Sequence, residues 1–167
     1  MQFYWDGSQN DNWDNNTNWN SGGAGGHPNT AAEDANILIN NRKNMDLRNS
    51  DIVLNDLRIE LSDGLRTLRK GTLTLATGTV NNQGPQLEWT LTGTATGVEF
   101  QSDLAVTFAN TTDLEGYTAA NTYGPAPLTF SGTIAGGAVV HQYGGRVILN
   151  NGGNTYSGDW YLRDDSE

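Results

Sequence analysis

The sequence predicts an all-β protein, a right-handed parallel β-helix (β-solenoid) whose first turn is covered by an N-terminal cap. Short strand patterns recur along the chain, and corners rich in glycine and asparagine separate them. No segment sustains the 3.6-residue apolar stripe of an amphipathic helix. Only 35% of the residues are hydrophobic, which favours a slender body with a thin core. A β-sandwich is the alternative, because it also consists of many short strands.

Residues 1–30 differ from the rest of the chain, since they are rich in Trp, Asn, Asp and Gly and almost devoid of aliphatic residues. The indoles of Trp5, Trp13 and Trp19 cannot form an aliphatic core, so we expect them to pack on the open end of the body. A solenoid needs such a cover, because its first turn exposes apolar interior and unpaired strand edges. We therefore predict a cap over residues 1–30 and β-helix rungs over residues 31–167.

Strand candidates recur from residue 31 onward, mostly about eight to twenty residues apart. They are Ile37–Ile39, Ile52–Leu54, Leu57–Leu61, Thr72–Leu75, Leu87–Leu91, Val98–Phe100, Ala105–Phe108, Leu128–Phe130, Val147–Leu149 and Trp160–Leu162. Corners such as Asn151-Gly152-Gly153 suit sharp turns, because Gly and Asn tolerate left-handed backbone conformations.

Threonine and asparagine lie within and beside the strands, as in Thr72–Leu75 and Leu149–Asn151. Rungs that stack about 4.8 Å apart place like side chains over like, and polar side chains then hydrogen-bond along the axis. This pattern favours the β-helix over the sandwich.

The net charge of −10 is unevenly distributed. Seven of the nine basic residues lie between residues 42 and 70, and none lies between residues 71 and 145. They are Arg42, Lys43, Arg48, Arg58, Arg66, Arg69 and Lys70. The basic-free half cannot offer a cationic track to phosphates, so nucleic-acid binding is not expected. Acidic residues interleave with the basic ones, which predicts a solvated face.

Other function classes are excluded or disfavoured by composition. Cysteine is absent, which excludes disulfides and thiolate metal sites. There is no long apolar run, so we expect no membrane insertion by this segment. The C-terminal residues follow a strand pattern at once, which favours a segment cut from a longer chain.

The chain resembles the bacterial autotransporter-associated β-strand repeat family at both ends. The repeat motif is matched by a strand pattern, then Gly153, Asn154, Thr155, Tyr156, Ser157 and Gly158, then Trp160–Leu162. The segment 128–136, LTFSGTIAG, is similar to the Phe-Ser-Gly-x-Ile-x-Gly sequence that leads into that repeat. The opening residues 4–7, YWDG, with Asn12-Trp13 and Asn18-Trp19, are similar to the start of many such proteins.

The resemblance implies a parallel β-helix from a large secreted or surface-displayed protein, with no catalytic residues to carry over. The leading hypothesis is therefore a non-enzymatic, adhesive or structural stalk, extracellular or on the bacterial surface in association with the outer membrane. Its expected partners are further repeats of the same chain or, by end-to-end association, another copy. A carbohydrate-binding module that takes a polysaccharide is the first alternative.

Candidate catalytic groups are few. A nucleophilic triad needs a base, and the chain offers only His27 and His141, in a linker and a strand pattern respectively. We predict no catalytic residue. A polysaccharide lyase or hydrolase is the third hypothesis, for which adjacent rungs would have to pair carboxylates from Asp51, Asp56, Glu60 and Asp63.

Two kinds of binding site are candidates. The loop that contains Asp6 and Asp11, with Asp14 nearby, offers hard oxygen ligands for Ca²⁺, although a hydrogen-bonded Asx-rich loop without any cofactor is favoured. Four aromatic residues are candidates for stacking on sugar rings, but aromatic residues in a thin-cored solenoid more often pack at corners and ends. These four are Trp89, Tyr117, Tyr123 and Tyr143.

Overall fold

The protein is all-β. The computed structural model describes residues 1–7, 9–21, 25–38, 44–76, 84–121 and 127–163. Thirteen strands of these residues form one mixed sheet that does not close, and their only helical element is a 3-10 turn, η1 (Asn16–Asn18). The strands are β1 (Gln2–Trp5), β2 (Trp19–Asn20), β3 (Asp34–Ile37), β4 (Asn44–Leu54), β5 (Asp56–Leu75), β6 (Gln86–Phe100), β7 (Leu104–Phe108), β8 (Thr112–Asn121), β9 (Pro127–Phe130), β10 (Ile134–Gly136), β11 (Val140–Tyr143), β12 (Arg146–Leu149) and β13 (Trp160–Arg163).

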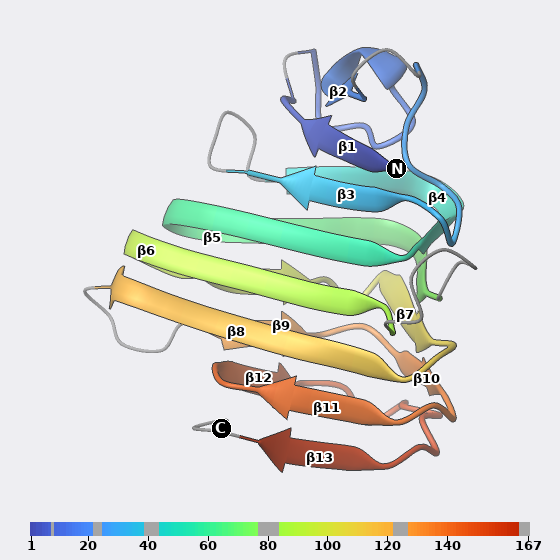
Figure 1. Ribbon diagram of the computed structural model, residues 1–167, viewed down its shortest axis with the longest axis vertical. Helices are drawn as coiled ribbons and strands as arrows, with labels where there is room; N and C mark the ends of the chain where they lie inside the picture. The colour runs from blue at the N-terminus through green and yellow to red at the C-terminus, as the bar shows by residue number, and fades with distance from the viewer. Residues whose placement is uncertain (8, 22–24, 39–43, 77–83, 122–126, 164–167) are drawn as a thin grey trace.

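The strands lie in three rows, and the first, row A, faces the viewer in Figure 1. Row A runs from the N-terminal to the C-terminal end in the order β1, β3, β5, β6, β8, β11 and β13, and every neighbour in it is parallel. Short β2 adds an antiparallel edge to β1. The long strands β5 and β6 contribute their first halves to this row, whereas β8 pairs in it as far as Asn121.

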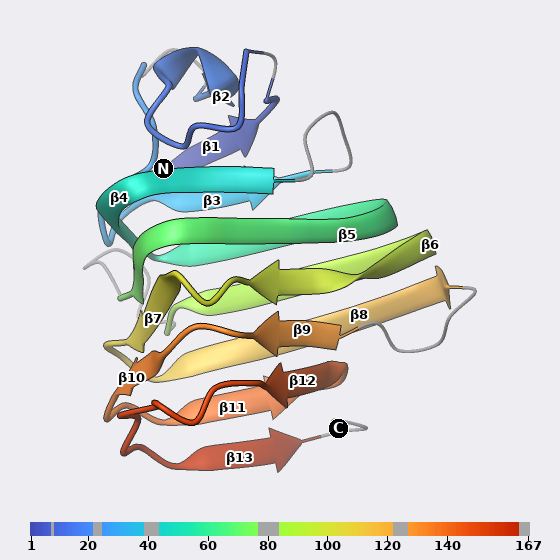
Figure 2. The same cartoon turned by 180° about the vertical axis from the view of Figure 1, so that it is seen from behind.

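The other two rows can be followed in Figure 2, which shows the molecule from behind. Row B is residues 44–46 of β4, 65–69 of β5 and 97–100 of β6, then β9 and β12. Row C is residues 50–54 of β4 and 71–75 of β5, then β7 and β10. All pairings in both rows are parallel, and the chain passes from row A to B to C before it returns to row A.

The predicted strands fall within or overlap the strands of the structure, and the all-β prediction is confirmed. The strands also include segments without a predicted counterpart, above all β8. Residues 31–48, the nearest approach to a helical pattern, form β3 and the start of β4 where the structure describes them. No helix in the described ranges is long and apolar enough to cross a lipid bilayer.

Alternating side chains place one set of residues inside the three rows. In β6 the buried positions recur at every second residue, from Leu87 through Trp89 to Leu91. The parallel register then stacks buried residues over one another, as in the column Ala35, Leu57, Leu87 and Leu114 of row A. The core is thus a set of apolar columns, stabilised by the burial of nonpolar surface.

Trp89 shows how bulky side chains fit into these columns. Its indole is fully buried, and its register partner in β8 is Gly116. A Cβ atom on Gly116 would lie 2.5 Å from Cζ2 of Trp89, and one on Gly145 would lie 2.6 Å from the same atom. Two glycines therefore provide the space that the ring occupies.

The N-terminal segment packs on the β1 end of the stack. The rings of Trp5, Trp13 and Phe3 each make an edge contact with Trp19, at centroid distances of 5.0, 4.6 and 6.5 Å. Two buried indoles are hydrogen-bonded, since Nε1 of Trp13 donates to the Pro28 carbonyl and Nε1 of Trp19 to the Trp13 carbonyl. This aromatic cluster covers apolar residues that would otherwise face water.

The segment is also joined to row B through its backbone. The Trp13 amide donates to the Asp46 carbonyl at 2.9 Å, and the Asp46 amide donates to the Asp11 carbonyl at 2.8 Å. These two bonds continue the parallel pattern of the row beyond β4. The first strand of row B is therefore not an open edge at this point.

The basic stretch of residues 42–70 is not a uniformly solvated face, because Arg66 is only 1% exposed. Burial lowers the pKa of its guanidinium to about 10, against the opposing charge of Asp63. Arg66 lies opposite Val98 in row B, where an apolar residue would be expected. The interleaved charges of the sequence do not indicate that Arg66 is buried.

We predict that Gly116→Ala lowers the free energy of unfolding by about 1–3 kcal/mol, because the added methyl group overpacks the site against the Trp89 ring. Gly152→Ala is the matched control, since a Cβ there would meet no heavy atom within 4 Å. Urea unfolding measures both variants. Equal midpoints for the two would contradict the proposed packing.

Candidate functional site

The outward side chains of row A form the most varied surface of the described residues, which we call the row A surface. It combines carboxylates, amides, two arginines, a histidine and tyrosines in columns that run along the stack. Its members are Gln2, Tyr4, Asp34, Asn36, Asp56, Arg58, Glu60, Gln86, Glu88, Thr90, Asp113, Glu115, Tyr117, His141, Tyr143, Tyr161 and Arg163.

Like charges face one another on this surface. In the strand registers of the described ranges, Asp34 lies opposite Asp56 and Glu88 lies opposite Glu115, and no other register pairs two like charges. Directly opposed like charges destabilise a sheet. Rows B and C avoid such pairs, as where Asp46 lies opposite Arg69. In the described ranges, the cost of directly opposed like charges therefore falls on row A.

A groove of about 150 Å³ lies at the β1 end of this surface, lined mainly by polar side chains from β1, β3, β5 and β6. The carboxylate of Asp56 accepts a hydrogen bond from the backbone amide of Gln86 at 2.9 Å. The carboxylate of Asp34 accepts one from the side-chain nitrogen of Asn55 at 3.0 Å. Burial raises the pKa of Asp56 to about 6; the bond from Gln86 opposes this rise, and the charge of Asp34 adds to it.

Arg58 partly neutralises the middle of the surface. It forms ion pairs with Glu60 at 2.7 Å and with Glu88 at 3.2 Å. Burial raises the pKa of Glu88, Arg58 opposes the rise, and the charges of Glu115 and Glu60 add to it. The Arg58 guanidinium is thus shared between Glu60 and Glu88, and the negative charge of Glu115 lies beside this pair.

Aromatic rings gather at the C-terminal end of the same surface. Tyr117 on β8 is 50% exposed, and its hydroxyl donates to Glu115 at 2.7 Å, which raises the pKa of the phenol to about 12. His141 on β11 lies 3.3 Å from the Asp113 carboxylate, and its ring centroid is 5.7 Å from that of Tyr161 on β13. Tyr161 is 46% exposed, and the guanidinium of Arg163 lies over its ring.

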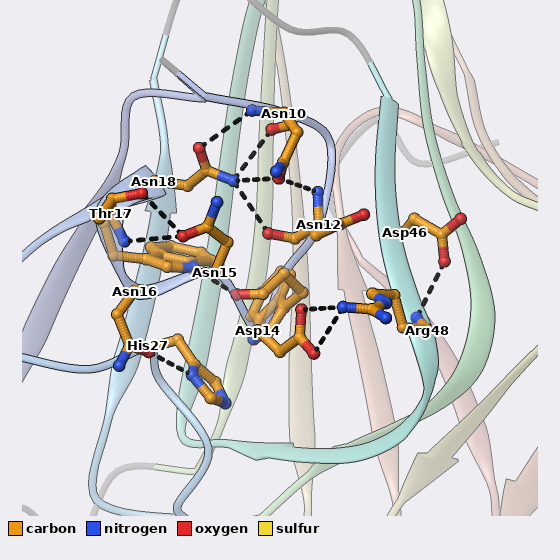
Figure 3. Close-up of polar contacts among 12 residues, drawn as sticks. Asn10, Asn12, Asp14, Asn15, Asn16, Thr17, Asn18, His27, Asp46 and Arg48 are labelled. Carbon is orange, nitrogen blue, oxygen red and sulfur yellow. Dashed lines mark hydrogen bonds and ion pairs between the residues drawn. The ribbon is translucent and has the colours of Figure 1, made fainter.

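The N-terminal segment has a separate polar network centred on Asn18 (Figure 3). Asn18 is fully buried, and its side-chain oxygen accepts from the amides of Gln9 and Asn10. Its side-chain nitrogen donates to the carbonyls of Asn10 and Asn12. Because both ends of the amide group are satisfied, this buried asparagine fixes the loop rather than presenting groups to a ligand.

The three aspartates proposed for Ca²⁺ do not converge on one point. Asp14 forms an ion pair with Arg48 at 3.4 Å (Figure 3), whereas Asp11 contributes its backbone carbonyl to Asp46 and Asp6 donates its backbone amide to Asn18. The described residues contain no group of three acidic or histidine side chains placed to hold a metal ion. Ca²⁺ binding stays a prediction from the sequence.

The motif residues 153–158 lie against row C. The amides of Thr155 and Ser157 donate to the carbonyls of Ile134 and Gly136, which extends the row past β10. The Asn154 side chain accepts from the Ile134 amide at 2.9 Å. Gly153 donates its amide to the Asn151 side chain at 2.6 Å and lies in the corner before this segment.

Tyr156 and Gly158 complete the segment. The Tyr156 ring makes edge contacts with Phe108 and Trp160, and its hydroxyl donates to the Ala138 carbonyl at 2.6 Å. A Cβ on Gly158 would lie 2.0 Å from that same carbonyl oxygen. Each of the six motif residues thus has a packing or hydrogen-bonding role in the stack.

The four residues proposed for sugar stacking do not form one cluster. Trp89 lies in the core, so its ring cannot meet an external ligand, and Tyr123 lies outside the described residues. Tyr117 and the half-buried Tyr143 lie on the row A surface. Residue type alone did not separate Trp89 from Tyr117, because the two glycines beside the indole are distant in sequence.

Sequence reasoning missed the association of Tyr161 and Asp34 with this surface. A signal for it existed in the recurring triplets Asp56-Leu57-Arg58, Gln86-Leu87-Glu88 and Asp113-Leu114-Glu115, which occupy equivalent positions of row A. Aligning these triplets would have placed the outward columns in register.

The candidate catalytic groups are dispersed. Asp51 lies on row C, Asp63 lies at the corner between rows A and B, and Asp56 and Glu60 lie on the row A surface. His27 contacts the Asn16 side chain at 2.9 Å in the N-terminal segment (Figure 3), far along the chain from the site of His141.

A scan of protein-family models and searches of curated proteins and of solved structures returned no significant match to the chain. The function is therefore inferred from the residues and their geometry.

We predict that acidification stabilises the protein through Asp56. Its pKa is raised from 3.8 to about 6 on folding, so the folded state binds more protons between these values and stability falls as the pH rises through this window. The contribution of Asp56 is about 1–2 kcal/mol, since the group is only partly shielded from solvent. Urea unfolding between pH 4 and 7 measures this trend. Asp56→Asn should reduce it, and the part that stays reflects other carboxylates with a raised pKa, such as Glu88.

Glu60→Gln is the control for that experiment, because the Glu60 carboxylate is paired with Arg58 and not with a like-charged register partner. If Asp56→Asn showed the same pH trend as the unmodified protein, the raised pKa of Asp56 would be refuted.

Proposed function

We propose that the chain is a parallel β-helix that acts as a non-enzymatic structural segment, a stiff stalk of a larger surface protein. The observation that carries this proposal is the unbroken parallel pairing of row A from β1 to β13, with the same A, B, C order of rows from β3 onward. Each turn is then one rung, and backbone hydrogen bonds join every rung to the next. Right-handed turns are the expected hand, as for nearly all parallel crossover connections.

Parallel pairing also favours this fold over the sandwich, because sandwich sheets are antiparallel. A rung contacts only its neighbours, so added rungs lengthen the body without enlarging the core. This accounts for the low hydrophobic content of the sequence, since a thin core runs along the axis.

The proposed location and family follow from the resemblance. The motif residues 153–158 and the tryptophan-rich start are similar to autotransporter-associated repeats, which supports a secreted, adhesive role on the bacterial surface. Extension and display, rather than turnover, suit a body whose candidate catalytic groups are dispersed.

The last rung supports a proposal about partners. At the β13 end, an apolar hollow of about 260 Å³ is lined by Gln142, Val147, Leu149, Trp160 and Leu162. Leu149 and Leu162 are 51% and 62% exposed although their register partners Phe130 and Gln142 are buried. We propose that further rungs, from the same chain or from another copy, cover this surface.

The stalk proposal is tested by stretching single molecules between handles at Met1 and Arg163. We expect extension in successive steps of one rung, since each rung is held mainly by its neighbours. Leu87→Ala leaves a cavity in one rung, and should weaken the step that releases this rung while leaving the others unchanged. Release of the whole chain in one event would argue for a single globular core instead.

We predict that the 167-residue chain associates through its last rung as its concentration rises, and that Leu162→Lys weakens this association at least about tenfold by placing a charge on the apolar surface. Sedimentation velocity measures both proteins. Leu65→Lys is the control, because Leu65 is 41% exposed but lies on row B. A monomer at millimolar concentration, or equal weakening of the association by both substitutions, would contradict this prediction.

A further inference from the structure

Among the residues that the structure describes, the most exposed aromatic side chains lie on one face of the protein. In the described ranges, the aromatic residues that are more than a third exposed are Tyr4, Tyr117 and Tyr161, and all three lie on the row A surface. Rows B and C point their aromatic rings inward, as Phe100, Phe108 and Phe130 do. Exposed apolar residues that are scattered singly are normal, whereas exposed rings that share one face indicate a binding surface.

The rings at the C-terminal end are held in place before any ligand arrives. The hydroxyl of Tyr117 is fixed by Glu115 at 2.7 Å, and the Tyr161 ring contacts the tilted His141 ring and the guanidinium of Arg163, each 5.7 Å from its centroid. Strands β8, β11 and β13 are neighbours, so Tyr117 and Tyr161 lie two strand spacings apart across the stack, or about 10 Å. Tyr161 is in register with Asp113, four residues before Tyr117, which adds an offset of about 13 Å along the strands. Fixed rings lose little conformational freedom on binding.

The rest of the surface carries groups that bind hydroxyls. The groove of about 150 Å³ presents the side chains of Gln2, Asn36 and Gln86 beside the carboxylates of Asp34 and Asp56. Amides donate and accept hydrogen bonds, and carboxylates accept them from pairs of hydroxyl groups. Tyr161 shares a column of side chains with Asp34, Asp56 and Gln86, whereas Tyr117 lies in the column of Glu60 and Thr90. An elongated ligand that contacts the groove and both rings therefore crosses the columns obliquely.

The charge of the surface selects the ligand. Six carboxylates lie on it, among them the like-charged pairs Asp34–Asp56 and Glu88–Glu115, and Arg58 is already engaged by Glu60 and Glu88. A polyanion such as a nucleic acid or a uronic-acid polymer would be repelled. An uncharged chain with apolar C–H faces and many hydroxyls matches both the rings and the polar groups.

We propose that the row A surface binds a neutral polysaccharide that runs obliquely across the stack of strands, with its sugar faces on Tyr117 and Tyr161 and its hydroxyls on the groove of Asp34, Asn36 and Gln86. This site differs from the one drawn from sequence alone, because it excludes Trp89 and adds Tyr161. It does not depend on the stalk proposal, which is measured by force and not by ligand binding.

The test is electrophoresis of the folded chain through native gels that contain xylan, galactomannan or mixed-linkage β-glucan, with polygalacturonate as the anionic comparison. We expect retardation by at least one neutral polysaccharide and none by polygalacturonate. Tyr117→Ala and Tyr161→Ala should each weaken the affinity about three- to tenfold, as expected for the loss of one aromatic contact.

Leu65→Ala is the control variant, since it removes an exposed apolar side chain from row B. Tyr117→Phe keeps the ring and removes the hydrogen bond to Glu115, so this variant should retain most of the affinity. Comparison with Tyr117→Ala then isolates the effect of losing the ring. Circular dichroism establishes that each variant is folded. The proposal is overturned by no retardation on any neutral polysaccharide, by stronger binding to polygalacturonate, or by equal affinity of both alanine variants and the unmodified protein.

Discussion

The parallel backbone pairing between successive strands is the constraint on which the rest of the structure depends. In row A it runs from β1 to β13, and it sets every residue of one strand over a defined residue of the next. A slip by one residue would turn each buried column outward. Packing of Trp89 over Gly116, as well as the like-charged pair Glu88–Glu115, follows from this single register.

The same register separates stability from recognition. Inward columns such as Ala35, Leu57, Leu87 and Leu114 remove apolar surface from water, whereas the outward columns are free to carry groups that do not stabilise the fold. Rows B and C use that freedom little, and row A concentrates carboxylates, amides and rings. Departures from the rules for stable sheets tend to mark functional surfaces, and here they gather on one face.

The strand pattern was largely predictable, because alternation and glycine-rich corners are local features, and Leu87–Leu91 or Leu128–Phe130 could be assigned from neighbours alone. Contacts between residues that are distant in the sequence were harder to predict. Trp89 was a candidate for sugar stacking because nothing near it in the sequence indicates Gly116 and Gly145. The burial of Arg66 was not predicted either, since its neighbours in the sequence are charged or polar as well as apolar. The outward face was partly encoded by the Asp/Gln-Leu-Arg/Glu triplets, which needed alignment across strands to be interpreted.

The Asn18 network and the indole cluster also bear on the order of folding. Their contacts join residues close in sequence, such as Asn10 with Asn18 and Trp13 with Trp19, so little chain entropy opposes their formation. The strands that follow pair with partners nineteen or more residues away. A segment that assembles first and exposes the edge of β1 gives each later strand a template, so the register is inherited from one end instead of being searched for along the whole chain.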